Sequence, residues 1–312
     1  MTDSVKKPID SIIAETKRQI QPYVFKRLES RRPRQAGRKI ARTITIASGK
    51  GGVGKTNIVA NLAISLAQAG RRVIILDADL GLANIDVVFG IRPKYNLTDV
   101  VTGDLSLDQI MVPGPRGIQI IAGGSGISEL AHLPPDRARR LFEQLRFLED
   151  KADYLLIDTG AGIGENVISF CLAADQIFVV TTPEPTAMAD AYGIIKVISQ
   201  SRPEAHLSVL VNRVADDQEG VFVHDRLAKV AEEYLRFPVR WLGAIPQDPQ
   251  MYLAVRQQTP LLLFSPMSPA AQRIRKLVTE VFHETLEEQI ESEGMEGFLT
   301  RLSKFFGGGV RA

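Results

Sequence analysis

A glycine-rich loop close to residue 50 constrains the fold of this chain more than any other feature of the sequence. Residues 49–56 read GKGGVGKT, which is the spacing of a nucleotide P-loop. The β-branched, alternating segment 43–47 before the loop predicts a strand, and the apolar segment 58–69 after it predicts a buried helix. A strand, a glycine loop and a helix in this order are the context that a phosphate-binding loop requires. A glycine-rich turn without a ligand is the alternative, but two lysines and a threonine have no packing use there.

The chemistry expected of this loop follows from its residue types. Glycines let successive backbone N–H groups point at phosphate oxygens, and the helix that begins near Lys55 adds the positive end of its dipole. Lys55 should reach the β- and γ-phosphates, and the hydroxyl of Thr56 should bind Mg²⁺. The nucleotide is therefore expected to contact the loop and the residue that follows it, namely Gly49, Lys50, Gly51, Gly52, Val53, Gly54, Lys55, Thr56 and Asn57.

One lysine of the loop is not needed to bind the phosphates of its own subunit. Lys55 already fills the lysine position of the P-loop, so Lys50 needs another explanation. Residues 50–56, KGGVGKT, resemble the deviant Walker A ATPases of the MinD/ParA group residue for residue. The resemblance implies a homodimer that forms with ATP and Mg²⁺, in which Lys50 crosses the interface to the partner's ATP, and which separates after hydrolysis. A solvated surface lysine is the alternative.

Acidic residues follow two of the predicted strands. Residues 76–86 read LDADLGLANID, and carboxylates at the mouth of a P-loop can hold a water molecule or a hydrated Mg²⁺. The resemblance implies that Asp79 orients the attacking water and that Asp77 supports the water shell of Mg²⁺; a polar turn with incidental acids is the alternative. Residues 153–162, DYLLIDTGAG, have a Walker B form that delivers Asp158 to the Mg²⁺. The expected catalytic residues are Lys50, Lys55 and Asp79, and the expected metal residues are Thr56, Asp77, Asp79 and Asp158.

Recognition of the base is expected at the end of a later strand. Residues 211–213 read VNR, and an asparagine amide can donate and accept hydrogen bonds together, as the edge of adenine requires. The resemblance implies that Asn212, beside Arg213, reads the adenine with help from the loop Pro246-Gln247-Asp248. The alternative for Asn212 is a cap at the end of a strand.

The rest of the chain alternates between short apolar segments and helical patterns. We expect strands at 72–76, 117–121, 154–157, 176–180, 207–211 and 241–245, and helices at 136–148, 185–202 and 221–235. Leu141, Phe142, Leu145 and Leu148 recur at helical spacing and should be core residues. The alternation predicts an α/β fold with a mostly parallel, doubly wound sheet, helices on both faces, and the ligand at the carboxyl ends of the strands.

Composition and charge bound the remaining choices. A content of 45% apolar and 24% charged residues is ordinary for a globular protein, and no segment approaches the roughly 20 apolar residues of a membrane span. The only cysteine, Cys171, lies in an apolar run and is expected to be a reduced core residue of a cytoplasmic protein, and the four histidines show no metal-site spacing. We divide the chain into a basic N-terminal extension (1–41), a P-loop ATPase domain (42–285), and an acidic linker with a C-terminal helix (286–312).

The N-terminal leader concentrates positive charge. Residues 1–42 contain twelve Lys and Arg and four Asp and Glu, a net charge of +8, so the rest of the chain carries −6 within the overall +2. A basic leader on an acidic body suggests an interaction arm, and a solubilising tail is an equally open alternative.

The C-terminal tail changes character along its length. Residues 284–296 hold six glutamates and no Lys or Arg. The following apolar residues recur at helical spacing within an arc of about 120°, with Arg301 and Lys304 outside it. A stripe of this kind suits the surface of an anionic membrane, as in MinD-like relatives, and its weak lipid affinity would require the two copies of a dimer. The alternative is a last helix docked on its own core. The stripe begins at Met295, and its expected lipid contacts are Phe298, Leu299, Leu302, Phe305 and Phe306.

Two local sequences favour the flagellar branch of the family, the FlhG (FleN, YlxH) proteins, over the cell-division branch, MinD. Residues 158–162 read DTGAG where MinD proteins usually have DSPAG, and residues 77–84 read DADLGLAN, the flagellar form. The resemblance then implies a slow, partner-stimulated ATPase that cycles between the cytoplasm and the inner face of the cell membrane and regulates flagellar number and placement. Its expected partners are the GTPase FlhF, a flagellar switch or C-ring protein, or a flagellar transcription regulator. The sequence lacks the Asp-Gln-Ala element that many flagellar relatives carry for FlhF.

Three other functions remain open from the sequence. A MinD-like regulator of the division septum shares the nucleotide motifs. A chromosome- or plasmid-partition ATPase would use the basic leader to bind DNA with a steep salt dependence, although DNA is not the partner that we expect. A regulator without hydrolysis would bind ATP and titrate a transcription factor.

Overall fold

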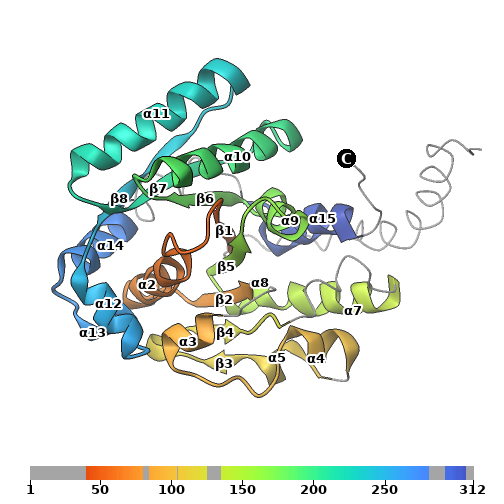
Figure 1. The fold of residues 1–312 in the computed structure, drawn as a ribbon. Helices are drawn as coiled ribbons and strands as arrows, with labels where there is room; N and C mark the ends of the chain where they lie inside the picture. The colour runs from red at the N-terminus through yellow and green to blue at the C-terminus, as the bar shows by residue number, and fades with distance from the viewer. Residues whose placement is uncertain (1–39, 80–83, 104, 125–134, 281–291, 307–312) are drawn as a thin grey trace, which may run out of the picture.

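An eight-stranded β-sheet forms the middle layer of the structure (Figure 1). The computed structural model describes residues 40–79, 84–103, 105–124, 135–280 and 292–306. The strand order is β3-β4-β2-β5-β1-β6-β7-β8, and every neighbouring pair is parallel except β3 and β4. The predicted α/β fold is therefore confirmed. The strands are β1 (Arg42–Ser48), β2 (Val73–Ala78), β3 (Val112–Pro113), β4 (Gln119–Ile121), β5 (Tyr154–Ala161), β6 (Gln176–Thr181), β7 (Leu207–Val214) and β8 (Arg240–Pro246).

Helices cover both faces of this sheet because alternate residues of each strand are buried on opposite sides. In β5, Tyr154 and Leu156 belong to one core, and Leu155 and Ile157 belong to the core on the other face. The first helical layer consists of α2 (Lys55–Gln68), α3 (Ile85–Phe89), α12 (Pro249–Arg256), α13 (Leu261–Phe264) and α14 (Pro269–Glu280). The second consists of α4 (Leu97–Thr102), α5 (Leu107–Ile110), α7 (Pro135–Arg146), α8 (Leu148–Lys151), α9 (Glu165–Ala173), α10 (Pro185–Ser201), α11 (Asp217–Leu235) and α15 (Gly294–Phe306).

Most elements lie where the sequence placed them, and the differences have local causes. All seven predicted strands form, and Cys171 is a buried free thiol. The helix expected over 136–148 is two helices, α7 and α8, which meet at the exposed Phe147. Strand β3 and the helices α3, α4, α5, α9, α12, α13 and α14 were not predicted. Those of two to six residues carry too little periodicity to be recognised from the sequence. A 3₁₀ turn, η1 (Pro115–Gly117), connects β3 to β4.

The position of β1 at the centre of the sheet brings the predicted site together. Its neighbours are β5 on one side and β6 on the other. The loop that follows β1 therefore meets the loops that follow β2, β5, β6 and β7, since parallel strands end at one edge. Nucleotide sites in open parallel sheets occupy this edge.

The C-terminal helix α15 is docked on the protein rather than presented to solvent. It packs between α7 and α9 and contacts the start of β1 (Figure 1). The apolar stripe faces inward: Met295, Phe298, Leu299 and Leu302 are 0–3% exposed. In this state, burial of Phe298, Leu299 and Leu302 replaces the lipid contact predicted from the sequence, which matches the alternative of a docked last helix. Phe305 is half-buried, and the side chain of Phe306 lies outside the described residues.

Two predictions about the ends of the domain concern residues that the structure leaves out. The basic leader, residues 1–39, and the acidic linker, residues 281–291, lie outside the described residues. The three-part division of the chain therefore stays a prediction. Within the described residues, no helix combines the length and hydropathy that crossing a membrane requires.

Packing around α7 and α8 predicts a large loss of stability when one apolar residue is replaced and almost none when its neighbour is replaced. Leu145 is 4% exposed and Phe147 is 65% exposed. Leu145→Ala should lower the free energy of unfolding by about 2–5 kcal/mol, because it leaves a cavity in the core. Phe147→Ala should change it by less than about 0.5 kcal/mol. Urea denaturation followed by circular dichroism measures both, and equal costs would contradict the assigned packing.

Candidate functional site

The P-loop between β1 and α2 is packed so closely that two of its glycines have no room for a side chain. A Cβ atom on Gly49 would lie 2.3 Å from the backbone of Asp190 in α10. Gly54 has a left-handed backbone with φ of 95°, and a Cβ atom there would lie 2.5 Å from the amide nitrogen of Asn212. These glycines therefore allow close approach by α10 and β7, in addition to shaping the phosphate-binding backbone.

The P-loop lysine forms a buried ion pair on the floor of the site. Lys55 Nζ donates to Asp158 Oδ1 at 2.6 Å, and the two side chains are 8% and 1% exposed. Burial raises the pKa of Asp158, and the Lys55 ammonium and a hydrogen bond from Thr56 oppose that rise. The structure thus brings together Lys55, Thr56 and Asp158, three residues that the sequence assigned to phosphate and metal binding.

Two further carboxylates, those of Asp77 and Asp79, stand beside this ion pair. β2 and β5 pair so that Asp77 lies opposite Asp158. Asp77 accepts hydrogen bonds from the backbone N–H groups of Asp79 at 3.0 Å and Ile85 at 3.2 Å. Burial, followed by the negative charge of Asp158, raises the pKa of Asp77 to about 7. Full ionisation of this cluster is therefore costly, and a bound cation would relieve it.

The donor set of the cluster suits Mg²⁺. Asp158 Oδ2 is buried and has no hydrogen-bond partner among the described residues, and Thr56 contacts the same carboxylate. Hard oxygen donors of this kind are the ligands that Mg²⁺ prefers. Within the described ranges, no three His, Cys, Asp or Glu side chains are grouped to hold a metal alone. Phosphate oxygens and water would have to complete the coordination, which is usual for Mg²⁺ at nucleotides.

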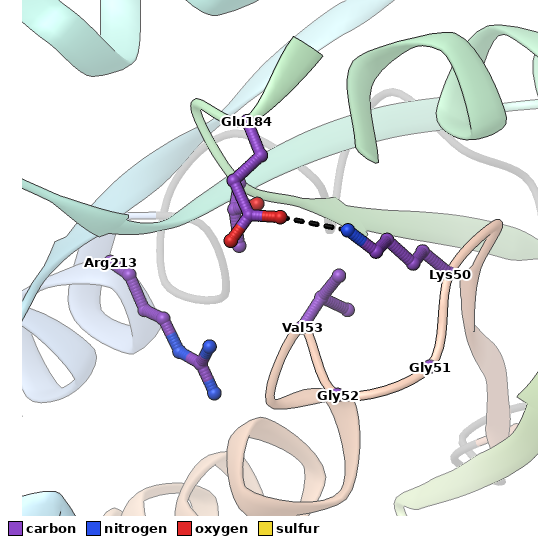
Figure 2. A pocket seen from close by; sticks show the side chains of 7 residues that line it. Lys50, Gly51, Gly52, Val53, Glu184 and Arg213 are labelled. Carbon is purple, nitrogen blue, oxygen red and sulfur yellow. Dashed lines mark hydrogen bonds and ion pairs between the residues drawn. The ribbon is translucent and has the colours of Figure 1, made fainter. Parts of the chain in front are cut away.

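Lys50 lies at the rim of the site rather than on its floor (Figure 2). Its ammonium group donates to Glu184 Oε2 at 2.8 Å and to Thr186 Oγ1 at 3.0 Å, both at the N-terminal end of α10. The hydrogen bond from Lys50, then the Lys50 charge and to a lesser degree the Arg213 charge, lower the pKa of Glu184. A cavity of about 130 Å³ opens between Lys50, Glu184 and Arg213 over the backbone of residues 51–53. Figure 2 shows Lys50 and Arg213 entering it from opposite sides.

The residues expected to read the base lie at the ends of β7 and β8. Asn212 is buried, and its amide donates to the carbonyl of Val53 at 2.7 Å. Arg213 follows in a left-handed conformation with φ of 61°, at an irregularity in the pairing of β7 with β8. Asp248 caps the start of α12 and also accepts from the first turn of α14. Base recognition therefore stays a prediction for Asn212, Arg213, Pro246, Gln247 and Asp248.

The residues that hold Lys50 were not predicted from the sequence. Residues 181–186, TTPEPT, supply Glu184 and Thr186 directly after β6. β6 pairs with β1, so its carboxyl end lies beside the P-loop. A polar run after a fully buried strand was the signal that would have found them.

Comparisons with known proteins agree with this geometry. The sequence profile of the CobQ/CobB/MinD/ParA nucleotide binding domain matches residues 44–261. The antiactivator FleN of Pseudomonas aeruginosa is 39% identical over 238 residues, which cover 76% of this chain and 85% of FleN. The flagellum site-determining protein YlxH of Helicobacter pylori is 38% identical over 269 residues, covering 85% of this chain and 90% of YlxH. The septum site-determining protein MinD of Pyrococcus horikoshii, solved with Mg-ADP, superposes with a TM-score of 0.62 at 28% identity, covering 80% of this chain and 98% of that one.

The close contact at Gly49 gives a matched pair of variants. Gly49→Ala should lower the stability of the nucleotide-free protein by about 1–3 kcal/mol, because the new methyl group overlaps the backbone of α10. Gly51→Ala is the control, since a Cβ atom there meets nothing within 4 Å. Thermal unfolding without nucleotide measures both melting temperatures. Equal melting temperatures would show that α10 does not press on the P-loop.

Proposed function

Because the chain belongs to the CobQ/CobB/MinD/ParA family of nucleotide-binding domains, we propose that it is an ATPase that dimerises around two bound Mg²⁺-ATP. The observation that carries this proposal is the separation of the two P-loop lysines. The Lys55 side chain is 8% exposed on the floor of the site, whereas the Lys50 side chain is 39% exposed at the rim. One lysine is thus available to the subunit's own nucleotide and the other to a partner. Lys50 would have to leave Glu184 and Thr186 to cross the interface, and an ion pair this exposed is weak enough to exchange.

For hydrolysis, we assign the activation of water to Asp79. A Cβ atom on Gly160 would lie 3.4 Å from Asp79 Oδ1, so this carboxylate faces the segment after Asp158 that we call switch II, residues 159–164. Gly162 donates its backbone N–H to the carbonyl of Ser48 at 2.8 Å, which joins switch II to the start of the P-loop. A carboxylate at this point can orient a water molecule toward the γ-phosphate. Asp77, Asp158 and Thr56 would hold Mg²⁺ and its water, and the bound ion would neutralise phosphate charge.

The biological role that we propose is the regulation of flagellar number and placement. YlxH is named as a flagellum site-determining protein and FleN as an antiactivator. The DTGAG and DADLGLAN sequences at residues 158–162 and 77–84 support the same branch of the family. A flagellar transcription activator, FlhF or a flagellar switch protein is therefore the partner that we expect to meet the ATP-bound dimer.

We further propose that α15 exchanges between two environments, the membrane and its docked position between α7 and α9, which we call its groove. Its buried apolar stripe and its position at the end of the described chain support a helix that can leave without unfolding the sheet. A short amphipathic helix binds lipid weakly, so the two copies of an ATP dimer would attach stably and a monomer would return to the cytoplasm. Hydrolysis would then end attachment to the inner face of the cell membrane.

Replacing Lys55 and replacing Lys50 should affect two different properties, ATP binding and dimerisation. Lys55→Ala should weaken ATP binding by about tenfold to a hundredfold, because the β- and γ-phosphates lose a charge-assisted hydrogen bond. Lys50→Ala should bind ATP normally and remain a monomer. Titration with a fluorescent ATP analogue and light scattering with ATP and Mg²⁺ measure the two properties. A normal ATP-dependent dimer of the Lys50 variant would contradict the proposed dimer.

The cellular role is tested by deleting the gene. We expect cells with an altered number or position of flagella, and no minicells. Complementation with Lys50→Ala should not restore the wild-type pattern, because this variant binds ATP without forming the dimer. Minicells with normal flagella would favour a septum regulator, and cells without DNA would favour a partition ATPase. Either result would overturn the flagellar assignment.

A further inference from the structure

Arg301 of α15 points into the protein, although the sequence placed it outside the apolar arc of this helix. Its Nε donates to the carbonyl of Ala173 at 2.7 Å, its Nη2 contacts Asp175 Oδ1 at 2.9 Å, and its Nη1 contacts Glu293 Oε2 at 2.5 Å. Only 16% of the Arg301 side chain is exposed, whereas Lys304 on the same helix is exposed. We call Arg301 with these three partners the Arg301 clasp. The two basic residues of α15 therefore stand in opposite environments.

The carboxylate of Asp175 is the centre of this clasp. It is buried at 4% exposure and also accepts from the backbone N–H and the hydroxyl of Thr43, each at 3.0 Å, and from Ser292 Oγ at 2.9 Å. One carboxylate thus joins the start of β1, the residues before α15, and α15 itself. Departure of Arg301 would leave a buried charge without its cation, which is unfavourable. The clasp therefore holds α15 in its groove by more than apolar contact.

Helix α9 connects the clasp with the nucleotide site. It begins at Glu165, directly after switch II, and ends at Ala173, whose carbonyl accepts from Arg301. Arg202, at the end of α10, donates to the neighbouring carbonyls of Leu172 and Ala174. Two guanidinium groups thus cap the C-terminal end of α9, where the helix dipole favours positive charge. Burial, and to a lesser degree the Arg301 charge, lowers the pKa of Arg202.

Hydrogen bonds also attach α9 to the strand that leads into the P-loop. Thr45 in β1 donates its hydroxyl to the carbonyl of Phe170 at 3.0 Å. Gly162, two residues before the helix cap, donates to the carbonyl of Ser48. With nine residues, α9 is about 13 Å long, so one short helix connects switch II with the clasp and would carry a displacement of one to the other.

We propose that the Arg301 clasp is the latch through which the nucleotide state controls the release of α15. This inference rests on the proposed role of α15 as the membrane helix. The γ-phosphate repositions switch II, α9 moves with it, and the carbonyl of Ala173 separates from Arg301. The clasp opens, α15 leaves the groove, and Arg301 becomes available to anionic lipid. Arg301 thus opposes membrane binding in the monomer, whereas Lys304 only favours it.

Hydrogen–deuterium exchange of residues 294–306 in the full-length, lipid-free protein tests the latch. In the wild type, a non-hydrolysable ATP analogue with Mg²⁺ should accelerate exchange in α15. Arg301→Gln should accelerate it about tenfold without nucleotide, because a charge-assisted contact worth about 1.4 kcal/mol or more is lost, and should abolish the nucleotide dependence. Asp175→Asn, which leaves α15 itself unchanged, should do the same. Lys304→Gln is the matched control and should leave exchange unchanged.

Sedimentation with vesicles of phosphatidylglycerol and phosphatidylethanolamine gives a second readout. Arg301→Gln should sediment without ATP, whereas Lys304→Gln should sediment less than the wild type with ATP. The latch is overturned if α15 exchanges in Arg301→Gln and Asp175→Asn as slowly as in the wild type, or if ATP leaves wild-type exchange unchanged. If the exchange results hold but wild-type protein never sediments with ATP, the latch stands and the membrane role of α15 is wrong. A retained cooperative melting transition in both variants excludes general unfolding as the cause.

Discussion

The buried ion pair between Lys55 and Asp158 is the interaction on which the geometry of the site depends. It joins the first residue of α2 to the fifth residue of β5 at 2.6 Å, with both side chains almost fully buried. Breaking such a pair by removing one partner typically costs about 3–5 kcal/mol, because the other charge stays buried. Asp77, Asp158 and Thr56 gather around this pair, where we propose that a cation and phosphates bind and would compensate its charges. A nucleotide would draw Lys55 away from Asp158, and Mg²⁺ would take its place as the compensating charge.

A second charged cluster stands at the start of β1, the opposite end of the strand that leads into the P-loop. Asp175 ties the start of β1 to α15, and Arg202 and Arg301 cap the end of α9. The nucleotide edge and the α15 groove thus share two elements, β1 and α9, and each element has one end in either place. A parallel sheet favours this arrangement, because each strand and each covering helix runs between the carboxyl ends of the strands, where ligands bind, and their amino ends.

The sequence predicted the fold and the floor of the site because both depend on local patterns. The P-loop spacing, the strand before Asp158 and the alternating strands and helices each lie within a few residues of one another, and all appear as expected. The contacts of Glu184 and Thr186 with Lys50 were not predicted, because they join residues that are 134 and 136 positions apart. The capping contacts of Asp248 depend likewise on where α12 and α14 pack.

The amino-acid sequence by itself determined the nucleotide-binding class, the family, and the amphipathic character of the last helix. Each of these follows from residue types at fixed short spacings, which no tertiary arrangement can change. Only the tertiary structure decided which surface the apolar stripe of α15 covers and which way Arg301 points. An amphipathic pattern shows that one face of a helix needs an apolar partner, but lipid and a groove between α7 and α9 satisfy it equally. The position of Asp175 and the carbonyl of Ala173, both more than 120 residues away in the chain, makes Arg301 an internal contact.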